Sequence, residues 1–344
     1  MNIVVLCGGL SNERDVSVTS GVGVAKALRQ RGHKVVLLDL LFGYPGEFSD
    51  PSELFERDWA AEQHSVGESA PDIAALRRSR GDCPVGDNVI SVCKAADITF
   101  LALHGDIGEN GKLQALLDVN GVKYTGSGYL GSALAMNKGV SKKLFAASGI
   151  PTPPGVTVTK SEPPYADIGF PCVVKPCSGG SSVGTSIVND AQQYEEALNF
   201  AFKYEQTVIV EKYIKGRELT VGVLDSKAMP AIEIIPNSGF YDYKNKYQPG
   251  LTRELCPAPL TPEQTDAVSR LAERVAKCLL IDAYCRADFF MSEDDGTMYC
   301  LEANTLPGMT PTSLIPQMAA QQGMDFGELC EKIIEVSMKK YAEE

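Results

Sequence analysis

The chain has 344 residues, of which 44% are hydrophobic and 22% are charged, and its formal net charge is −12. This length predicts two or three domains, and the composition is typical of a folded globular protein. The acidic balance argues against nucleic acid or an anionic membrane as a partner, and no apolar run approaches the roughly 18 residues that a membrane span needs. The ten cysteines include no CxxC pair and the chain starts without a signal peptide, so we expect free thiols in a reducing cytoplasm.

The first part of the chain, residues 1–128, is predicted to be an α/β domain. Its elements follow the order strand, helix, strand, which is typical of a parallel sheet covered by helices. We expect strands at 3–7, 35–40 and 97–103, and helices at about 16–30 and after residue 111. From about 42 to 92 the pattern is lost and Pro, Gly, Ser and charged residues accumulate. We interpret this stretch as an insertion with short helices near 51–63 and 71–80.

Two further domains are predicted, a central one at 129–213 and a C-terminal one at 214–344. Within the central domain, the segment Gly149–Pro154 contains three prolines, which cannot continue a helix and so end the first helix of that domain. For the central domain we expect helices at 129–148 and 191–204 and strands at 155–159, 171–175 and 208–212. For the C-terminal domain we expect strands at 218–225, at 228–235 and around 286–304, and helices at 261–278, 316–322 and 325–340.

The strand pair near the end of the chain carries the most informative polar side chains. Because side chains alternate between the faces of a strand, Arg286 and Asp288 share one face of the first strand, and Glu302 shares a face with Asn304 on the second. A two-residue turn would put Asp288 opposite Ala303, with Glu302 on the wrong face. A three-residue Asp-Asp-Gly turn puts Asp288 opposite Glu302 instead. We favour this register because it gathers oxygen ligands for Mg²⁺ beside a fixed guanidinium.

Two other segments have the composition of nucleotide-binding elements. Lys175 ends a buried strand and leads into a glycine–serine loop, whose small residues let backbone amides and hydroxyls approach a phosphate. The loop lacks the order GxxxxGK[ST], so it is not a P-loop, and a flexible β-turn has the same composition. Glu211 stands at the end of strand 208–212, where it could pair with an adenine edge. An edge strand with a surface acid would look the same.

Three further features stay open on sequence alone. The segment 239–247 is too long and too aromatic for a simple linker, and it predicts either a lid or an aromatic surface loop. Glu13 follows the first strand–helix turn, where α/β folds bind ligands, although it could equally complement the helix dipole. That turn is not a GxGxxG dinucleotide motif. His104 lies in a glycine-rich turn, and a lone turn histidine is more often structural.

Taken in order, these segments resemble the D-alanine–D-alanine ligases of the ATP-grasp superfamily. The resemblance covers nearly the whole chain apart from about 42–92. It rests on five motifs: Gly-Gly-x-Ser-x-Glu-x-x-Val-Ser, His-Gly-x-x-Gly-Glu-x-Gly, Lys-Pro…Gly-Ser-Ser-x-Gly, Phe-Tyr-Asp-Tyr…Lys-Tyr and Arg-x-Asp…Leu-Glu-Ala-Asn-Thr-x-Pro-Gly-Met-Thr. Any one of them could arise by chance, but five in the right order could hardly do so.

The resemblance implies a three-domain ATP-grasp fold, with a parallel α/β domain first and ATP held between the central and C-terminal domains. It implies ligation of two D-alanines through an acyl phosphate, for synthesis of a peptidoglycan precursor. ATP and two Mg²⁺ (or Mn²⁺) ions are the implied cofactors. A cytoplasmic homodimer that acts on small molecules, without nucleic acid or membrane as partner, is the implied setting.

The resemblance also implies roles for individual residues. For the nucleotide these are Lys138, Lys175 and Lys246 at the phosphates, Glu211 and Ile214 at the adenine edge, Phe240 and Leu301 on its faces, and Glu218 at the ribose. For the metal ions they are Asp288, Glu302 and Asn304. For substrate binding they are His104 near the first amino acid, and Ser313 and Leu314 at the second carboxylate. For catalysis they are Glu13 at the first ammonium, Arg286 and the Gly308 amide at the tetrahedral oxyanion, and Ser181 and Tyr247, which close the site with Glu13.

The sequence departs from the family pattern at a few positions. Asn110 and Asn137 stand where aspartate is common, and the stretch 177–180 lacks a glutamate that some relatives carry. Three alternatives stay open: D-serine or D-lactate as the second substrate, another ATP-grasp carboxylate–amine ligase such as a dipeptide or glutathione-like synthetase, and a catalytically idle nucleotide-binding regulator. The Lys246–Tyr247 pair argues against D-lactate, because ligases of that type carry a histidine in this loop. An idle regulator would lack a metal ligand, yet all three are present.

Overall fold

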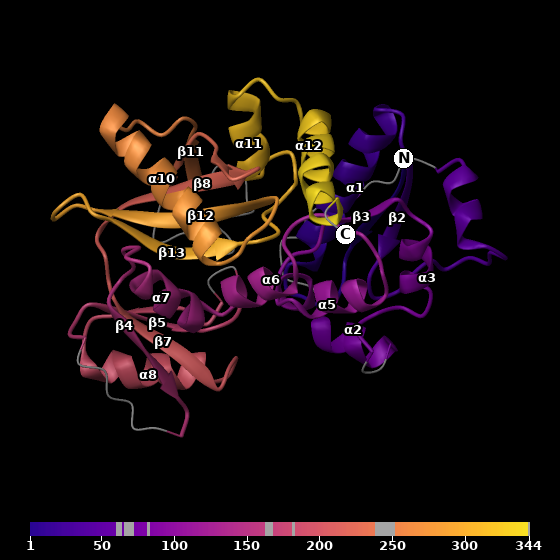
Figure 1. Cartoon of the computed structure of the whole chain (residues 1–344). Coiled ribbons are helices and arrows are strands. Elements are labelled where there is room, and N and C mark those ends of the chain that lie inside the picture. The colour runs from indigo at the N-terminus through magenta and orange to yellow at the C-terminus, as the bar shows by residue number, and fades with distance from the viewer. Residues whose placement is uncertain are drawn as a thin grey trace.

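The computed structural model describes residues 1–59, 64, 72–80, 83–161, 168–180, 183–237 and 252–342. Within these ranges, consecutive segments of the chain form three sheets, which Figure 1 shows in order from indigo through magenta to orange. None of the helices in the described ranges has both the length and the apolar character of a membrane span. The domain boundaries expected near 128 and 213 fall between the sheets and stay predictions.

The first sheet is parallel, with β1 (Asn2–Cys7) paired between β2 (Lys34–Asp39) and β3 (Ile98–Leu101). Its strands are almost continuous apolar runs because both faces of the sheet are covered. The helix α1 (Arg14–Gln30) packs on the sheet, so the predicted βαβ opening is confirmed. The remaining helices of this segment are η1 (Pro51–Glu56), α2 (Ile73–Arg80), α3 (Val89–Lys94), α4 (Asp106–Glu109) and α5 (Lys112–Val119).

The stretch interpreted as an insertion contributes to this core where it is described. Leu54 and Phe55 of η1 and Val89 and Val92 of α3 are buried among the side chains of the parallel sheet. The helix expected near 51–63 is a 3-10 helix that ends at Glu56, and the helix expected near 71–80 is α2. Apolar residues spaced too irregularly for a regular helix pattern therefore still pack into the domain.

The single helix expected at 129–148 is broken into α6 (Tyr129–Met136) and α7 (Lys138–Ala147). Asn137 between them has an extended backbone, and its side chain accepts a hydrogen bond from the amide of Val140 at 3.0 Å. This contact caps the amino end of α7. Asparagine caps a helix about as well as aspartate does, so the departure at Asn137 preserves the local structure.

The second sheet is antiparallel and has the strand order β4-β7-β5-β6. The strands are β4 (Gly155–Thr159), β5 (Cys172–Pro176), β6 (Ser186–Val188) and β7 (Thr207–Lys212), and α8 (Ala191–Ala201) packs on β5 and β6. The helix and three of the strands were predicted. The three-residue strand β6 was not, because it is too short to show an alternating pattern.

The third sheet is also antiparallel and has the order β11-β10-β8-β12-β13, with β9 paired to β8. The strands are β8 (Gly216–Leu224), β9 (Lys227–Ala228), β10 (Ile232–Pro236), β11 (Thr252–Leu255), β12 (Tyr284–Ser292) and β13 (Met298–Asn304). The helix α10 (Pro262–Cys278) covers one face, where it meets Cys285, Ala287 and Phe289 of β12. Alternation then directs Arg286 and Asp288 to the opposite face.

The predicted register of β12 and β13 is confirmed at the polar cluster, but the predicted turn is wrong. Asp288 pairs with Glu302 and Arg286 with Asn304. Ser292 and Thr297 close a turn of four residues rather than three, and Gly296 in it has φ +71°. A β-bulge between Asp288 and Phe289 shifts the register by one residue, with Leu301 as the extra residue on β13. The bulge corrects for the longer turn and keeps the polar residues together.

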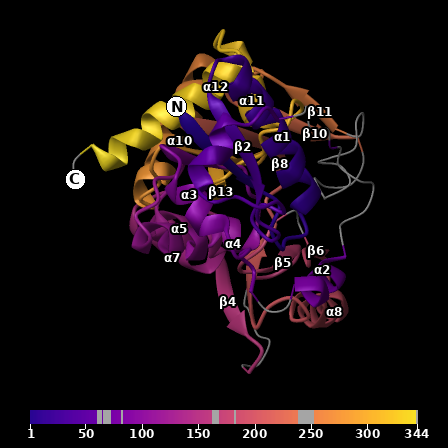
Figure 2. The same ribbon diagram turned by 90° about the vertical axis from the view of Figure 1, so that its right-hand side faces the viewer.

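The last helices return to the first sheet. After α11 (Leu314–Gln321), the helix α12 (Phe326–Met338) packs against α1, and η2 (Lys339–Tyr341) follows. Figures 1 and 2 both show α12, in yellow, beside the indigo α1. Buried residues of α12, such as Ile333 and Ile334, belong to the same apolar cluster as β1 and β3. The two ends of the chain therefore share one hydrophobic core.

Candidate active site

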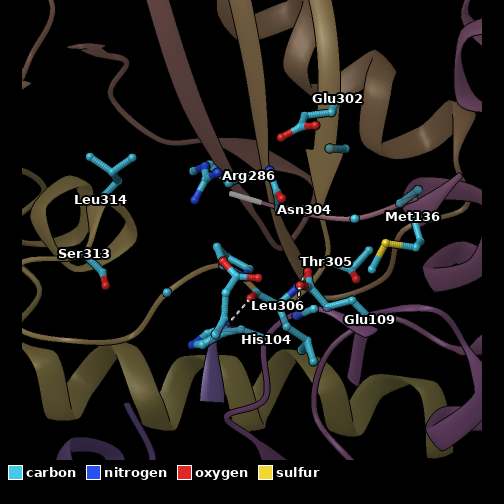
Figure 3. Close-up of a pocket in the computed structure, with 18 of the residues that line it drawn as sticks. His104, Glu109, Met136, Arg286, Glu302, Asn304, Thr305, Leu306, Ser313 and Leu314 are labelled. Carbon is cyan, nitrogen blue, oxygen red and sulfur yellow. Dashed lines mark hydrogen bonds between the residues drawn. The ribbon is translucent and has the colours of Figure 1, made fainter. Parts of the chain in front are cut away.

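Two adjoining cavities open on the face of the third sheet that is opposite α10. The larger has a volume of about 690 Å³ and lies between the second and third sheets. The smaller has a volume of about 100 Å³ and lies against the loops that follow β1, β3 and β13 (Figure 3). The residues that line both cavities are Lys138, Gly179, Gly180, Arg286 and Glu302. The two spaces therefore meet at a boundary that carries two cations and one carboxylate.

The larger cavity brings together the described residues that the sequence assigned to the nucleotide. These are Lys138, Lys175, Glu211, Ile214, Glu218 and Leu301. Phe240 and Lys246, which were assigned to the same ligand, lie outside the described residues. The bulge explains how Leu301 and Glu302 both reach the cavity, because neighbours on a regular strand would point to opposite faces.

Glu211 lies almost completely buried between two lysines. One carboxylate oxygen is 2.6 Å from Lys175 Nζ and the other is 2.6 Å from Lys142 Nζ. Burial alone would raise the pKa of Glu211, but the two lysines together hold it below its usual value. The contact of Glu211 with an adenine edge stays a prediction, since its carboxylate already serves as the counter-charge of two amines.

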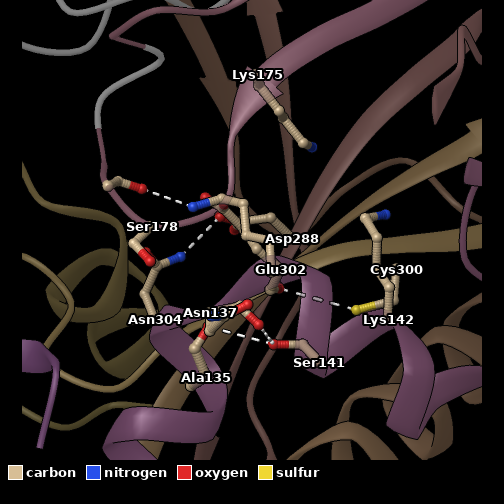
Figure 4. Close-up of polar contacts among 12 residues, drawn as sticks. Ala135, Asn137, Ser141, Lys142, Lys175, Ser178, Asp288, Cys300, Glu302 and Asn304 are labelled. Atoms are coloured by element: carbon tan, nitrogen blue, oxygen red, sulfur yellow. Dashed lines mark hydrogen bonds and ion pairs between the residues drawn. The ribbon is translucent and has the colours of Figure 1, made fainter. Parts of the chain in front are cut away.

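Lys142 was not predicted from the sequence. Its signal is the spacing of one helical turn from Lys138, which puts both lysines on one face of α7. Both are largely buried, which is unusual for lysine unless it is paired. Figure 4 shows Lys142 on α7 and Lys175 on its strand, with both side chains extended into the same region.

The metal ligands expected from the sequence lie side by side. Asp288 is 8% exposed and receives two hydrogen bonds of 2.9 Å from Arg286, one of 2.6 Å from Thr220 and one of 3.0 Å from the Asn304 amide nitrogen. Glu302 lies 3.2 Å from Lys138 Nζ. No three His, Cys, Asp or Glu side chains in the described ranges converge on one point. This patch therefore offers two carboxylates and one amide, a partial set of oxygen ligands.

The smaller cavity contains the described residues assigned to the two amino acids and to the oxyanion. These are Glu13, His104, Arg286, Gly308, Ser313 and Leu314, and Figure 3 shows Ser313 and Leu314 across the space from Glu302 and Asn304. Ser181 and Tyr247 lie outside the described residues. Gly180 approaches Glu13 closely, because a Cβ at this glycine would lie 2.9 Å from a Glu13 carboxylate oxygen. The glycine–serine loop thus borders both the nucleotide residues and the first-substrate residues.

His104 is buried, and both of its ring nitrogens contact protein groups. Nδ1 lies 2.9 Å from the carbonyl of Leu306, so Nδ1 carries the proton and donates, and Nε2 accepts from Ser20 Oγ at 3.0 Å. Burial lowers the pKa of His104 and favours the neutral ring. Ser20 also accepts from the amide of Met309 at 3.3 Å. His104 and Ser20 therefore fix the loop after β13, and the expected substrate contact of His104 stays a prediction.

Glu109 lines this cavity and, like Lys142, was not singled out from the sequence, although it stands in the His-Gly-x-x-Gly-Glu motif. Its carboxylate accepts from the amide of Gly105 at 2.6 Å and from the amide of Leu306 at 3.1 Å. Burial and the nearby charge of Glu13 raise the pKa of Glu109 to about 7. The residue joins the loop after β3 to the loop after β13.

Ser313 and Leu314 lie at the amino end of α11, where Ser313 is the N-cap residue. The Ser313 hydroxyl accepts a hydrogen bond from the amide of Thr310 at 3.0 Å. The first amides of a helix lack partners within the helix and carry partial positive charge, which favours a carboxylate. The expected position for the second substrate's carboxylate is therefore chemically suitable.

Comparison with known proteins identifies the family. The family described as D-ala D-ala ligase N-terminus matches residues 2–127, and the family described as D-ala D-ala ligase C-terminus matches residues 144–335. A D-alanine–D-alanine ligase of Lacticaseibacillus casei is 42% identical over 349 residues, which cover 100% of this chain and 97% of that protein.

Solved structures agree with the sequence comparison. The D-alanine–D-alanine ligase from Bacillus anthracis complexed with ATP is 30% identical, with a TM-score of 0.75 and coverage of 100% of this chain and 99% of that chain. The VanG D-Ala:D-Ser ligase from Enterococcus faecalis is 27% identical, with a TM-score of 0.75 and coverage of 98% and 99%. These neighbours confirm the expected ATP-grasp fold. The chain belongs to the D-alanine–D-alanine ligase family.

Proposed function

We propose that the protein joins two D-alanine molecules in an ATP-dependent reaction that yields D-alanyl-D-alanine, ADP and phosphate, and so supplies a peptidoglycan precursor. The observation that carries this proposal is the meeting of a large and a small cavity at Lys138, Arg286 and Glu302. A volume of about 690 Å³ is typical of a site for a cofactor-sized ligand. At the boundary, a substrate carboxylate and a terminal phosphate would meet beside two cations.

ATP is assigned to the larger cavity. Lys138 and Lys175 offset the charge of its phosphates, and Lys246, outside the described residues, is expected to join them. The adenine would lie at the carboxyl end of β7. The residues proposed for the base and the ribose are Glu211, Ile214, Leu301, Phe240 and Glu218.

Two Mg²⁺ or Mn²⁺ ions are assigned to Asp288, Glu302 and Asn304. The donor set fits, because Mg²⁺ takes oxygen ligands and is usually held by one or two carboxylates together with substrate phosphates. When bound, the metal offsets the negative charge that accumulates between the attacking carboxylate and the phosphate. Asn304 would hold an ion through its amide oxygen, while its amide nitrogen donates to Asp288 in the structure.

The first half of the reaction takes place at the boundary of the two cavities. Glu13 holds the ammonium group of the first D-alanine, and His104 forms part of the wall beside it. The substrate carboxylate attacks the γ-phosphorus of ATP, the bond from this phosphorus to the bridging oxygen breaks, and ADP leaves. Arg286 is fixed by its two hydrogen bonds to Asp288 and lines both cavities. Its positive charge is therefore close to the transferred phosphoryl group on either side of the boundary.

In the second half, the amine of the second D-alanine attacks the carbonyl carbon of the acyl phosphate. Ser313 and Leu314 receive the carboxylate of this second substrate at the amino end of α11. Arg286 and the amide of Gly308 donate to the developing oxyanion, a contribution typically worth about 3–4 kcal/mol per donor. The bond from the carbonyl carbon to the phosphate oxygen then breaks, the nitrogen gives up a proton to the departing phosphate, and the peptide bond is complete.

An acyl phosphate must be kept from water, so a closing element is required. Ser181, Lys246 and Tyr247 are proposed for this element on sequence alone. Consumption of ATP and ten free thiols suit the reducing cytoplasm, which we propose as the location. We also expect a homodimer, which analytical ultracentrifugation would test.

The second substrate is the point that most needs experiment, because a D-Ala:D-Ser ligase shares this fold. The purified protein should be incubated with ATP, Mg²⁺ and D-alanine alone or with D-serine, D-lactate or L-alanine, following both phosphate release and product mass. We expect D-alanine alone to give the fastest turnover. Faster formation of a mixed product would refute the D-alanine assignment. If none of these substrates causes release of phosphate from ATP, the ligase assignment is refuted and a nucleotide-binding regulator is favoured.

A further inference from the structure

Lys142 is a buried cation beside the nucleotide cavity that lines neither of the two cavities. Its side chain is 9% exposed, and its amine forms an ion pair with a Glu211 carboxylate oxygen at 2.6 Å and donates a hydrogen bond to Thr152 Oγ1 at 2.8 Å. The Thr152 hydroxyl in turn donates to the carbonyl of Cys300 at 2.9 Å, which fixes the direction of its lone pairs. A lysine whose amine is held by two protein partners, and which lines neither cavity, must act through those partners.

The partner that connects Lys142 to the cavity is Glu211. This carboxylate bridges Lys142 on one oxygen and Lys175 on the other, each at 2.6 Å, and Lys175 lines the larger cavity. Two amines around one carboxylate leave one positive charge in excess. If Lys142 were absent, Lys175 and Glu211 would form a neutral pair, with little net attraction for a phosphate.

The charge states agree with this arrangement. Burial lowers the pKa of Lys142, and the attraction of Glu211 opposes that shift. Burial would lower the pKa of Lys175 as well, but Glu211 and Glu302 outweigh it and raise the value. Lys175 therefore stays charged while its carboxylate partner is shared with a second amine. Because Glu211 is shared with Lys142, it fixes the orientation of the Lys175 side chain without completely neutralising the charge of the Lys175 ammonium.

We propose that Lys142 is a positioning residue for phosphate binding: it takes up part of the charge of Glu211 and thereby leaves the Lys175 ammonium directed at, and available to, the nucleotide phosphates. This inference deepens the proposed function and rests on the assignment of ATP to the larger cavity. Lys142 itself touches no ligand. Its removal should weaken the binding of phosphate-bearing nucleotides much more than that of the nucleoside.

The test is calorimetric titration of the full-length protein with ADP in the presence of Mg²⁺ and, separately, with adenosine. For Lys142→Met we expect ADP to bind about ten- to a hundredfold more weakly, the range of one charge-assisted hydrogen bond, and adenosine to bind within about twofold of the parent. Lys142→Arg should recover part of the ADP affinity. Lys143→Met is the matched control, because it removes an exposed lysine from the same helix and should leave both affinities unchanged.

The results of these titrations distinguish a positioning role of Lys142 from a purely structural one. Unchanged ADP affinity in Lys142→Met, or an equal loss for ADP and adenosine, would overturn the proposal and leave Lys142 a structural residue. If Lys142→Met does not fold, Thr152→Val decides instead: it removes the oxygen that orients the Lys142 amine, and a loss for ADP without a loss for adenosine supports the proposal. Equal effects on both ligands refute it. Failure of the parent protein to bind ADP would contradict the proposed function itself.

Discussion

The hydroxyl group of Ser20 allows a stringent test of how the smaller cavity is built. It is fully buried in α1, donates to His104 Nε2 at 3.0 Å and accepts from the amide of Met309 at 3.3 Å. In Ser20→Ala both partners lose a hydrogen bond in the interior, and each buried polar group without a partner costs roughly 1–3 kcal/mol. Because the amide contact is long, we expect the free energy of unfolding to fall by about 2–4 kcal/mol.

The same substitution should lower turnover. Met309 follows Gly308, whose amide is assigned to the oxyanion, and His104 fixes Leu306 in the same loop. A small displacement of such a donor costs about a hundredfold in rate, so we expect kcat to fall by about ten- to a hundredfold while ADP affinity stays within about twofold.

The assays are ADP release coupled to NADH oxidation, dipeptide yield, and urea unfolding. Thr19→Ala is the matched control, because that neighbouring hydroxyl donates to the carbonyl of Asp15 within its own helix at 2.8 Å. If Ser20→Ala and Thr19→Ala have the same kcat and the same urea midpoint, the proposed fixation of the loop is wrong.

Three further predictions concern other parts of the molecule. Glu302→Gln should abolish ligation, measured as ADP release, because it removes a proposed metal ligand. Glu293→Gln, at the exposed end of the same hairpin, is the control and should retain ligation. A near-parental rate in Glu302→Gln would contradict the metal assignment. Asn137→Ala should lower the free energy of unfolding by about 1 kcal/mol through loss of the α7 cap, whereas Asn137→Asp should not, as urea midpoints will show. The pKa of Glu109 is raised from 4.5 to about 7, so the folded state binds the proton more tightly than the unfolded state does. Its stabilising contribution is present below pH 4.5 and is lost as the pH rises through 7, by up to about 3 kcal/mol, and Glu109→Gln should show a correspondingly flatter dependence of stability on pH.

Periodic segments of the sequence predicted the strands and helices well, because burial on one face imposes a repeat. The helix at 261–278 matches α10 almost residue for residue, and Pro262 with the Thr261 cap marks its start. Local interruptions were not predicted. Asn137 breaks one expected helix into two, since a capping side chain competes with helix continuation at a position where the apolar pattern continues on both sides.

The hairpin at β12 and β13 illustrates how a correct register can follow from an incorrect turn. The chemistry of Asp288 and Glu302 selected the pairing, but the turn length was inferred from Asp-Asp-Gly alone. The bulge at Leu301 could not be predicted from this sequence, because leucine occurs both at bulged and at regularly paired positions of a strand. Tertiary pairing, rather than local preference, sets such a feature.

Among the site residues, those in contiguous motifs were predicted and those that act through space were not. In the amphipathic pattern of α7, Lys142 resembles an ordinary surface lysine, and in α1 Ser20 resembles an ordinary small residue. Their roles depend on Glu211 and His104, which are far away in the sequence. Only the fold brings these partners within hydrogen-bonding distance.

The packing of α12 on α1 bears on how the protein is made. During synthesis, domains usually fold in order from the amino terminus as they leave the ribosome. Here the apolar cluster around β1 is completed by Ile333 and Ile334, which are synthesised long after β1 and β3. A nascent chain must therefore expose the apolar surface of its unfinished first domain until α12 has been synthesised. A stop codon between α11 and α12 should yield a product that chaperones and proteases recognise, even though every proposed catalytic residue is still encoded.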